Sequence, residues 1–408
     1  MKILSSTWIV TCDEDFSIIK NGAVVFTDKI IEIDYKERIQ EKYPNIEITE
    51  LEENSVLMPG LVNSHVHLEF SANSTTLKYG NFMDWLNSVI KNREDLINDA
   101  NNELISSQLK KMQKTGTTTI GAISSYGFEL NACVKSNLNV VYFNEVIGSK
   151  PDMIDTLFTD FKARYNNSLK YKSKKFIPAL AIHSAYSVHP ILLRHCLDIA
   201  KKDGLAVSSH FLESPQEYEW LHKNEGGFLD FFKNFLGQEK AVTKPMEFLN
   251  AFKGIESLSF THCVETNKEE IQKIKELGAY INHCATSNRL LNNTKLDLNK
   301  INDVKFTIGT DGLSSNNSLS MFDELRNALM THTEHNCVDL SKRLLRAATL
   351  KGSRALGFKT KGIIKKDYDA DIICLKMPDK IESVDDIALN IILHTKFVKQ
   401  MYIGGEIV

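Results

Sequence analysis

The amino-acid sequence predicts an α/β protein, with a (β/α)8 barrel and a small composite β-sandwich domain formed by the two ends of the chain. Between residues 60 and 357, eight apolar, β-rich segments alternate with helical patterns. Both flanking segments, 1–59 and 358–408, have the texture of short strands and turns. A barrel takes about 250 residues, so the 408 residues leave room for one smaller domain.

The first segment contains short apolar and β-branched runs that are separated by turn residues, as in a sheet of short strands. The expected strands are Ile3–Thr11, Gly22–Phe26, Lys29–Ile33 and Ile46–Leu51. After Gly357 the same texture returns in Ala370–Lys376 and Phe397–Ile403, before a Gly404–Gly405 turn. Because these strands flank the barrel on both sides, we expect them to pair into one composite domain.

The central segment repeats a strand followed by a helix, which predicts a parallel sheet, and eight repeats predict its closure into a barrel. The strands are expected at Leu61–Asn63, Thr117–Ile123, Val140–Val146, Phe176–Ile182, Ala206–Ser209, Leu258–Thr261, Ala279–Asn282 and Lys305–Gly309. Helices are expected at Asp84–Lys111, Pro190–Lys202, Lys268–Leu277 and Met321–Thr331, with Val338–Leu356 closing the barrel region.

The amino-acid composition limits which partners and which cellular compartment can be expected for the protein. The net charge is −3, with 49 Lys and Arg against 52 Asp and Glu, so nothing favours binding to nucleic acid or to an anionic membrane. The N-terminus does not resemble a signal peptide, and no run reaches the ~20 apolar residues of a membrane span. The seven cysteines are scattered and form no Cys-x-x-Cys pair, so we expect neither a disulfide framework nor a structural zinc site. We therefore expect a cytoplasmic protein with neither a nucleic acid nor a membrane as partner, and a homodimer is possible because barrels of this size commonly pair.

Histidines gather at the ends of the predicted strands. Polar residues that end a barrel strand face the site at the carboxyl-terminal side of the barrel. The strand ends carry His65 and His67 (strand 1), His183 (strand 4), His210 (strand 5), His262 (strand 6), His283 (strand 7) and Asp311 (strand 8). We interpret the other histidines as surface or capping residues: His189, His195, His222, His332, His335 and His394.

A metal site follows from this placement. In His65-Val66-His67 both imidazoles lie on one face of the strand, because side chains alternate with period 2. Adding His210 and Asp311 gives three nitrogen donors and one oxygen donor, which suit Zn²⁺ or Fe²⁺ with a position left for water. Several barrel hydrolases bind a second metal through a modified lysine at the end of strand 4. Here strand 4 ends in His183 instead, so we expect one divalent ion.

The motifs around these residues resemble the amidohydrolase superfamily, specifically its deaminase and chlorohydrolase branch. The resemblance covers essentially the whole chain, through MPGLVNSHVHLE (58–69), HFLES (210–214), THC (261–263), HCATSNRLL (283–291), GTDGLSSNNSL (309–319) and ADIICL near the end. It implies the metal ligands His65, His67, His210 and Asp311, and it implies Glu213 and His262 as catalytic groups. One departure is HCATSN, where relatives often carry a proline before Ser-Asn.

Within the branch the chain is most similar to the aminofutalosine deaminases of the futalosine route to menaquinone, through His67-Leu68-Glu69, FMDW (82–85) and ESPQEYEWL (213–221). This implies hydrolytic deamination of a 6-aminopurine nucleoside, with 6-amino-6-deoxyfutalosine as the expected substrate. Deaminases of adenosine, S-adenosylhomocysteine, methylthioadenosine or guanine share most of these residues and stay open as alternatives, as does triazine dechlorination. A catalytically silent barrel is disfavoured, because no ligand or catalytic residue is missing.

The expected chemistry combines metal-activated water with proton transfer. Asp311 is expected to accept the proton of the water, His262 to stabilise charge at the reacting carbon, and Glu213 to protonate ring N1. An alternative role for Glu213 is the N-terminal turn of the helix that begins at Ser214-Pro215. Five residues are candidates to contact the substrate, although each also suits a structural role: Glu69, Trp85, His183, Asn288 and Ser315.

Overall fold

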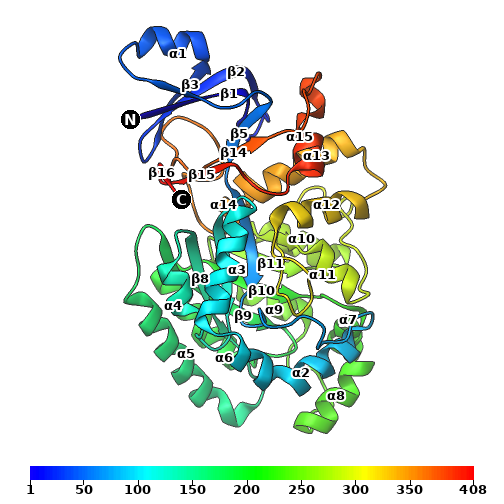
Figure 1. The fold of residues 1–408 in the computed structure, drawn as a ribbon. Helices are drawn as coiled ribbons and strands as arrows, with labels where there is room; N and C mark the ends of the chain where they lie inside the picture. Colours follow the sequence, from blue (N-terminus) through cyan, green and yellow to red (C-terminus); the bar gives the residue numbers. More distant parts are fainter.

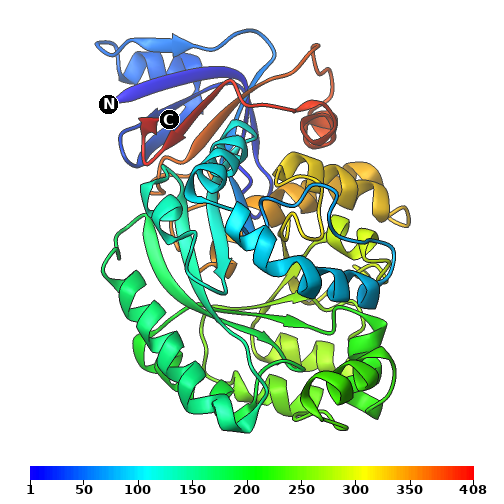
Figure 2. The same cartoon turned by 60° about the horizontal axis from the view of Figure 1, so that its bottom comes forward.

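The computed structural model describes residues 1–408, and its larger part is a barrel of parallel strands surrounded by helices (Figures 1 and 2). The strand order follows the sequence, from β6 to β13. The strands are β6 (Leu61–His67), β7 (Thr117–Ser124), β8 (Asn139–Val146), β9 (Phe176–Ser184), β10 (Val207–Phe211), β11 (Leu258–His262), β12 (Tyr280–His283) and β13 (Lys305–Ile308). All eight predicted strands are present, within a few residues of their expected bounds.

The first and last strands of this sheet are joined by hydrogen bonds that close the barrel. The Ser64 hydroxyl donates to the Ile308 carbonyl oxygen at 2.9 Å, and the Asn63 side-chain amide donates to Thr310 Oγ1 at 2.7 Å. The Asp311 backbone N–H donates to the His65 carbonyl oxygen at 3.1 Å. The predicted (β/α)8 barrel is therefore confirmed.

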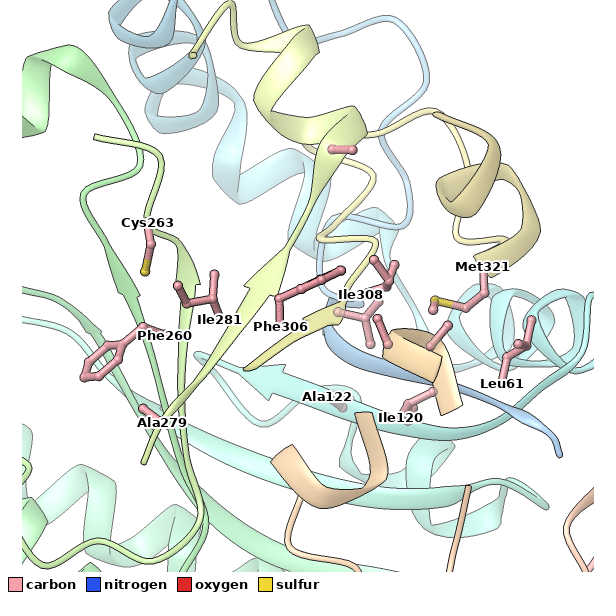
Figure 3. Packing of buried hydrophobic residues seen from close by; sticks show 14 of the residues in the cluster. Leu61, Ile120, Ala122, Phe260, Cys263, Ala279, Ile281, Phe306, Ile308 and Met321 are labelled. Carbon is pink, nitrogen blue, oxygen red and sulfur yellow. The ribbon is translucent and has the colours of Figure 1, made fainter. Parts of the chain in front are cut away.

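The two faces of each strand have different chemistry. Figure 3 shows Phe260, Ile281 and Phe306, from three successive strands, packed in one apolar layer. The alternate residues are polar and bond to one another: the Asn282 side-chain amide donates to Thr261 Oγ1 at 2.9 Å. These polar side chains lie beneath the histidines that end the strands.

The helices cover the outside of the barrel and the mouth of the site. They are α2 (Phe82–Asp99), α3 (Asn102–Lys114), α4 (Leu130–Lys135), α5 (Ile154–Leu169), α6 (Pro190–Asp203), α7 (Pro215–Lys223), α8 (Gly227–Leu236), α9 (Pro245–Ala251), α10 (Lys268–Glu276), α11 (Ala285–Leu290) and α12 (Met321–Thr331). A continuous helical stretch follows, made of α13 (Cys337–Arg346), a π-helical turn (Ala347–Lys351) and α14 (Gly352–Ala355).

One helix expectation is wrong. The sequence predicted a single helix over Asp84–Lys111, whereas the structure has two helices, α2 and α3, separated at Ala100 and Asn101. The Asn101 side chain accepts a hydrogen bond from the Leu104 N–H at 3.0 Å and so caps α3. Asparagine favours the N-cap because its side chain satisfies an N–H that lacks a helical partner.

The two ends of the chain form the second part of the molecule (Figure 1). One hydrogen-bonded sheet runs in the order β16-β15-β14-β5-β1-β2-β3, with β4 also paired to β1. Its strands are β1 (Lys2–Val10), β2 (Ile18–Phe26), β3 (Ile30–Tyr35), β4 (Ile48–Glu50), β5 (Ser55–Pro59), β14 (Ile372–Lys376), β15 (Gln400–Ile403) and β16 (Glu406–Ile407). Two short helices, α1 (Lys36–Lys42) and α15 (Ile387–His394), complete this part.

This sheet folds over an apolar core to which both ends of the chain contribute. Phe26 of β2 and Tyr402 of β15 meet edge to face, with ring centroids 5.2 Å apart. Strand β5 pairs antiparallel with β14 over its whole length. The composite β domain is therefore present, while its boundaries at 1–59 and 358–408, around a barrel at 60–357, stay a prediction.

A buried ion cluster links the composite domain to the barrel. The Lys361 ammonium lies 2.9 Å from Asp369 and 2.8 Å from Asp371, and its residue is 6% exposed. Asp371 also accepts hydrogen bonds from Asn139 of β8 at 2.9 Å and from the Gly404 N–H at 2.7 Å. Every charged group in this cluster therefore has a partner.

None of the helices combines the length and the apolar composition that a crossing of the bilayer requires.

Candidate active site

The four predicted metal ligands converge at the carboxyl-terminal end of the barrel. One donor atom from each of His65, His67, His210 and Asp311 lies within 4.8 Å of the others. His67 Nε2 is 3.4 Å from His210 Nε2 and 3.8 Å from Asp311 Oδ1, and His65 Nε2 is also 3.8 Å from that oxygen. The strands thus bring together residues that are more than 240 positions apart in the chain.

Hydrogen bonds from neighbouring strands fix how two of these imidazoles face. His210 Nδ1 lies 2.9 Å from the His183 carbonyl oxygen, to which it donates, so that Nε2 carries the free lone pair. His65 Nδ1 lies 3.2 Å from the Thr261 hydroxyl. Such contacts orient histidine ligands and set which nitrogen binds the metal.

The donor set fits a divalent cation. Burial lowers the pKa of His65 and of His210, which keeps both imidazoles neutral, as metal ligands must be. His65 Nε2 is buried and has no hydrogen-bond partner. Although burial opposes protonation of His67, Glu69, whose Oε2 lies 3.8 Å from His67 Nδ1, and the charge of Asp311 raise its pKa to about 9. The carboxylates around His67 therefore favour positive charge at this place, which a bound cation would supply.

Glu213 and His262 face each other beside the ligands. His262 Nε2 lies 3.5 Å from Glu213 Oε1 and 3.9 Å from Asp311 Oδ2. Burial, together with the charges of Asp311 and Glu217, raises the pKa of Glu213 well above its usual range, which favours the protonated carboxyl. A protonated carboxyl in this position can act as a general acid.

Two further side chains hold this pair in place. Asn288 Oδ1 lies 2.9 Å from His262 Nδ1 and accepts a hydrogen bond from its N–H, which leaves the Nε2 lone pair facing the site while the ring is neutral. The Glu213 backbone N–H donates to the buried Glu217 Oε2 at 2.8 Å. Glu213 does not cap α7: the Ser214 hydroxyl accepts from the Glu217 N–H in that role.

The loops that carry these residues use left-handed backbone at non-glycine positions. The φ angles are +46° at Leu212, +71° at His262, +54° at Cys263 and +59° at Asp311. Such conformations cost about 1–3 kcal/mol each and concentrate at functional sites. Backbone bonds offset the cost, such as the one from the Cys263 N–H to the Phe211 carbonyl oxygen at 2.9 Å.

A cavity of about 460 Å³ opens above the ligands. His67, His210, His262, Asp311 and Glu213 lie at its floor. Apolar side chains of α2 and α8 line its walls, and these two helices are in contact through Phe82 and Phe228, whose ring centroids are 5.9 Å apart. The volume and the mostly apolar walls are typical of a small-molecule site.

The five predicted substrate contacts divide into two groups. Trp85 and His183 line the cavity, and the Trp85 indole N–H donates to the Ser314 carbonyl oxygen at 2.8 Å. Glu69, Asn288 and Ser315 are buried and do not line it. The Ser315 hydroxyl donates to Asp311 Oδ2 at 2.8 Å, and Glu69 accepts from the Ser125 N–H at 2.8 Å.

The site also contains residues that sequence reasoning missed. Glu145 of β8 lines the cavity at 1% exposure; its Oε2 accepts from the Ser125 hydroxyl at 2.6 Å, while its Oε1 has no partner. A lone acidic residue near the end of an apolar strand was the signal that could have revealed it. Ser287, whose hydroxyl donates to Asp311 Oδ2 at 2.8 Å, gave no comparable signal.

One histidine is more buried than we expected. His332 takes the C-cap position of α12, one of the two places expected for it, but it is 1% exposed, and its Nε2 lies 2.9 Å from Nε2 of His283. It ends the amphipathic helix α12 on the side that packs against the barrel, which its position after the helix pattern did not reveal. His189 does cap a helix, because its Nδ1 accepts from the Ile191 N–H at 3.2 Å.

Comparison of the chain with known protein families identifies the family to which it belongs. The model of the amidohydrolase family matches residues 56–408. The chain belongs to the amidohydrolase family. This amidohydrolase is a metal-dependent hydrolase that acts on C–N bonds.

Known proteins and solved structures are similar to this chain over nearly all of its length. The amidohydrolase is 48% identical over 390 residues to an aminodeoxyfutalosine deaminase of Nitratiruptor sp., covering 96% of both chains. It is 34% identical to an adenosine deaminase of Helicobacter pylori, covering 99% of both. A crystal structure of Helicobacter pylori aminofutalosine deaminase in complex with methylthio-coformycin matches with a TM-score of 0.95, 31% identity and full coverage of both chains.

Proposed function

We propose that this amidohydrolase deaminates a 6-aminopurine nucleoside, and that its substrate is 6-amino-6-deoxyfutalosine, which it converts to futalosine and ammonia on the route to menaquinone. The observation that carries the proposal is the position of Glu213, a buried carboxyl with a raised pKa that lies 3.5 Å from His262, which in turn lies 3.9 Å from Asp311. Ring nitrogen N1 must gain a proton as water adds to C6, and Glu213 is the acid in reach. The 48% identity to the aminodeoxyfutalosine deaminase of Nitratiruptor sp. supports this choice of substrate.

His65, His67, His210 and Asp311 would hold one divalent ion, for which imidazole nitrogen and carboxylate oxygen favour Zn²⁺ or Fe²⁺. When bound, such an ion lowers the pKa of water from about 15.7 to about 7.

The proton transfers balance among three side chains. Asp311 accepts one proton of the attacking water while Glu213 donates its own to N1. The histidines around Asp311, His67 foremost, outweigh burial and keep its pKa low, so Asp311 passes the proton on readily to the amino group, which leaves as ammonia. The ionised Glu213 then recovers a proton from the new C6 hydroxyl as the carbonyl forms. His262 Nε2, whose lone pair faces the site while the ring is neutral, orients the water by accepting a hydrogen bond from it.

The other polar side chains of the site would either contact the sugar of the substrate or position the catalytic residues. Glu145 Oε1, a buried acceptor without a donor, suits the vicinal hydroxyls of a ribose. His183 and Trp85 would contact the nucleoside from the cavity wall. Glu69, Asn288 and Ser315 would act from behind it, on His67, His262 and Asp311.

The main alternative is the same chemistry on adenosine, S-adenosylhomocysteine or methylthioadenosine, which the adenosine deaminase relative favours. Ammonia release from purified protein of known metal content separates these substrates. A kcat/KM for 6-amino-6-deoxyfutalosine at least a hundredfold above the others would support the proposed substrate. A preference for another nucleoside would move the protein to that activity, and no ammonia from any nucleoside with metal bound would refute deamination.

A further inference from the structure

A second cavity, of about 700 Å³, lies where the composite domain meets the barrel. Its walls come from α3, from α12 and the loop that precedes it, and from the end of α15 with the turn that follows. The loop before α12 separates this cavity from the active site: Asp311 and Ser314 line the active-site cavity, whereas Leu313 and residues 317–320 line the second one. No residue lines both, so the second cavity is not an extension of the first.

The wall of the second cavity carries an excess of positive charge. Lys111 and Lys114 of α3, Arg326 of α12 and Lys396, which follows α15, all line it. Asp323 is the one carboxylate among the lining residues, and it pairs with Arg326. The three lysines therefore have no carboxylate of the wall as a partner, and three positive charges remain without a counter-charge.

The pair of Arg326 and Asp323 is the fixed part of this wall. Arg326 Nη1 donates to the carbonyl oxygens of Ile392 and Thr395, both at 2.8 Å, which holds the guanidinium against the composite domain. The Ser318 hydroxyl donates to Asp323 Oδ2 at 2.8 Å, which ties the loop to α12. Because a guanidinium has five N–H donors, Arg326 keeps donors for a ligand beside these bonds.

The uncharged part of the wall suits an organic ligand that bears an anion. Gln108 and Asn317 contribute side-chain amides, whose N–H groups can donate to oxygen. Leu393 and Phe397 contribute apolar surface, and Phe397 is 67% exposed. An aromatic side chain at the edge of a cavity gains contact area when the apolar part of a ligand covers it.

We propose that this second cavity binds a phosphate monoester of a small organic molecule. The lysines and Arg326 bind the phosphate, and Leu393 and Phe397 pack against the organic group. A phosphate monoester carries about −1.5 to −2 charges at pH 7, which matches the excess charge of the wall better than the single charge of a carboxylate does. Lysine binds phosphate as a point charge, and arginine donates to it from a planar fork. Binding here requires no nucleoside and is independent of the proposed deamination.

The first test follows lysine reactivity in the metal-loaded wild type, with phenyl phosphate as the probe. Acetic anhydride labels exposed amines, and mass spectrometry compares the labelling with and without saturating probe. Lys114 and Lys396 should be protected by at least about threefold, because an ammonium held by phosphate is a poorer nucleophile. Lys110 and Lys399 are exposed lysines of the same two segments that do not line the cavity, and their labelling should not change. Equal effects at all four lysines would overturn the inference.

The second test compares K114Q/K396Q with K110Q/K399Q, which removes the same charge away from the cavity. The calorimetric Kd of phenyl phosphate should rise by about tenfold in K114Q/K396Q and stay within about twofold of the wild type in K110Q/K399Q. A phosphate that bound at the metal ligands instead would give K114Q/K396Q the Kd of the wild type, which would overturn the inference, as would the absence of binding to the wild type.

A third variant tests the apolar part of the site. The wild type should bind phenyl phosphate more tightly than inorganic phosphate, because Phe397 packs against the phenyl ring. F397S should lose most of this advantage and keep the Kd of the wild type for inorganic phosphate. An advantage that F397S retains in full would refute the packing of the organic group against Phe397.

Discussion

Two buried polar clusters of this molecule differ in how completely they are satisfied. Around Lys361, at the junction of the composite domain and the barrel, the ammonium has two carboxylate partners, and Asp371 accepts further bonds from Asn139 and Gly404. At the end of the barrel, polar atoms of comparable burial have no partner, among them His65 Nε2, His262 Nε2 and Glu145 Oε1.

This difference separates a structural cluster from a functional one. An unsatisfied buried polar group costs about 1–3 kcal/mol, so a fold tolerates several together only where another molecule completes them. The Lys361 cluster needs nothing from outside the chain. Substitutions in the Lys361 cluster should therefore reduce stability and leave activity unchanged. Substitutions in the cluster at the end of the barrel should reduce activity and leave stability unchanged.

The largest effect is expected for Glu213→Gln. The amide keeps the shape of the side chain but cannot donate an acid proton to N1, so kcat should fall by about 10²–10⁴-fold. The melting temperature should stay close to that of the wild type, since the substitution removes a buried ionisable group. Steady-state ammonia release and thermal unfolding together test this, and an active Glu213→Gln enzyme would rule out Glu213 as the acid.

Lys361→Met should show the opposite pattern. It leaves the buried Asp371 without its cation, whereas Asp369 keeps Lys29 at 3.8 Å, and breaking a buried pair in this way costs about 3–5 kcal/mol. Urea unfolding measures the loss, and the folded fraction should keep the kcat of the wild type. Lys359→Met, two residues away and exposed, is the matched control and should change the free energy of unfolding by less than about 0.5 kcal/mol.

A smaller effect is expected for Asn288, which contacts His262 and not the cavity. Asn288→Ala should lower kcat by about 10–100-fold with little change in KM, because His262 loses the partner that orients its ring. Asn288→Asp keeps the acceptor and adds charge, which raises the pKa of His262. It should recover part of kcat and move the acidic limb of the pH profile to higher pH; an unmoved limb would mean that Asn288 only fills space.

The smallest effect concerns Glu217, which holds the backbone of Glu213. Burial raises its pKa from 4.5 to about 7. The folded protein therefore retains a proton that the unfolded chain releases above its lower pKa, so stability falls as pH rises from 4.5 to about 7 and does not recover above it. Glu217→Gln removes this term, and its unfolding free energy should fall less steeply over that window, by up to about 1.4 kcal/mol per pH unit. If the unfolding free energies of the wild type and Glu217→Gln depended on pH with the same slope, the raised pKa of Glu217 would be contradicted.

The metal ligands could be predicted because their placement depends on local patterns. His65, His67, His210 and Asp311 each end an apolar run, and parallel strands align such ends at one side of a barrel. The roles of Glu145 and Ser287, and the burial of His332, depend on how distant helices pack, which no local pattern encodes. The break at Asn101 was missed because the helical pattern continues across it, and only the capping bond reveals it.

The pairing of β5 with β14 also has a consequence for the order of folding. Strands β1 to β5 leave the ribosome first, yet the edge of β5 finds its partner only when the last part of the chain emerges. The β1–β2 hairpin can form at once, whereas an open strand edge must wait beside a growing barrel and is prone to pairing with other chains. Synthesis of the tail both completes the sheet and ends that exposure, so truncation within the last strands should lead to aggregation before any loss of the barrel itself.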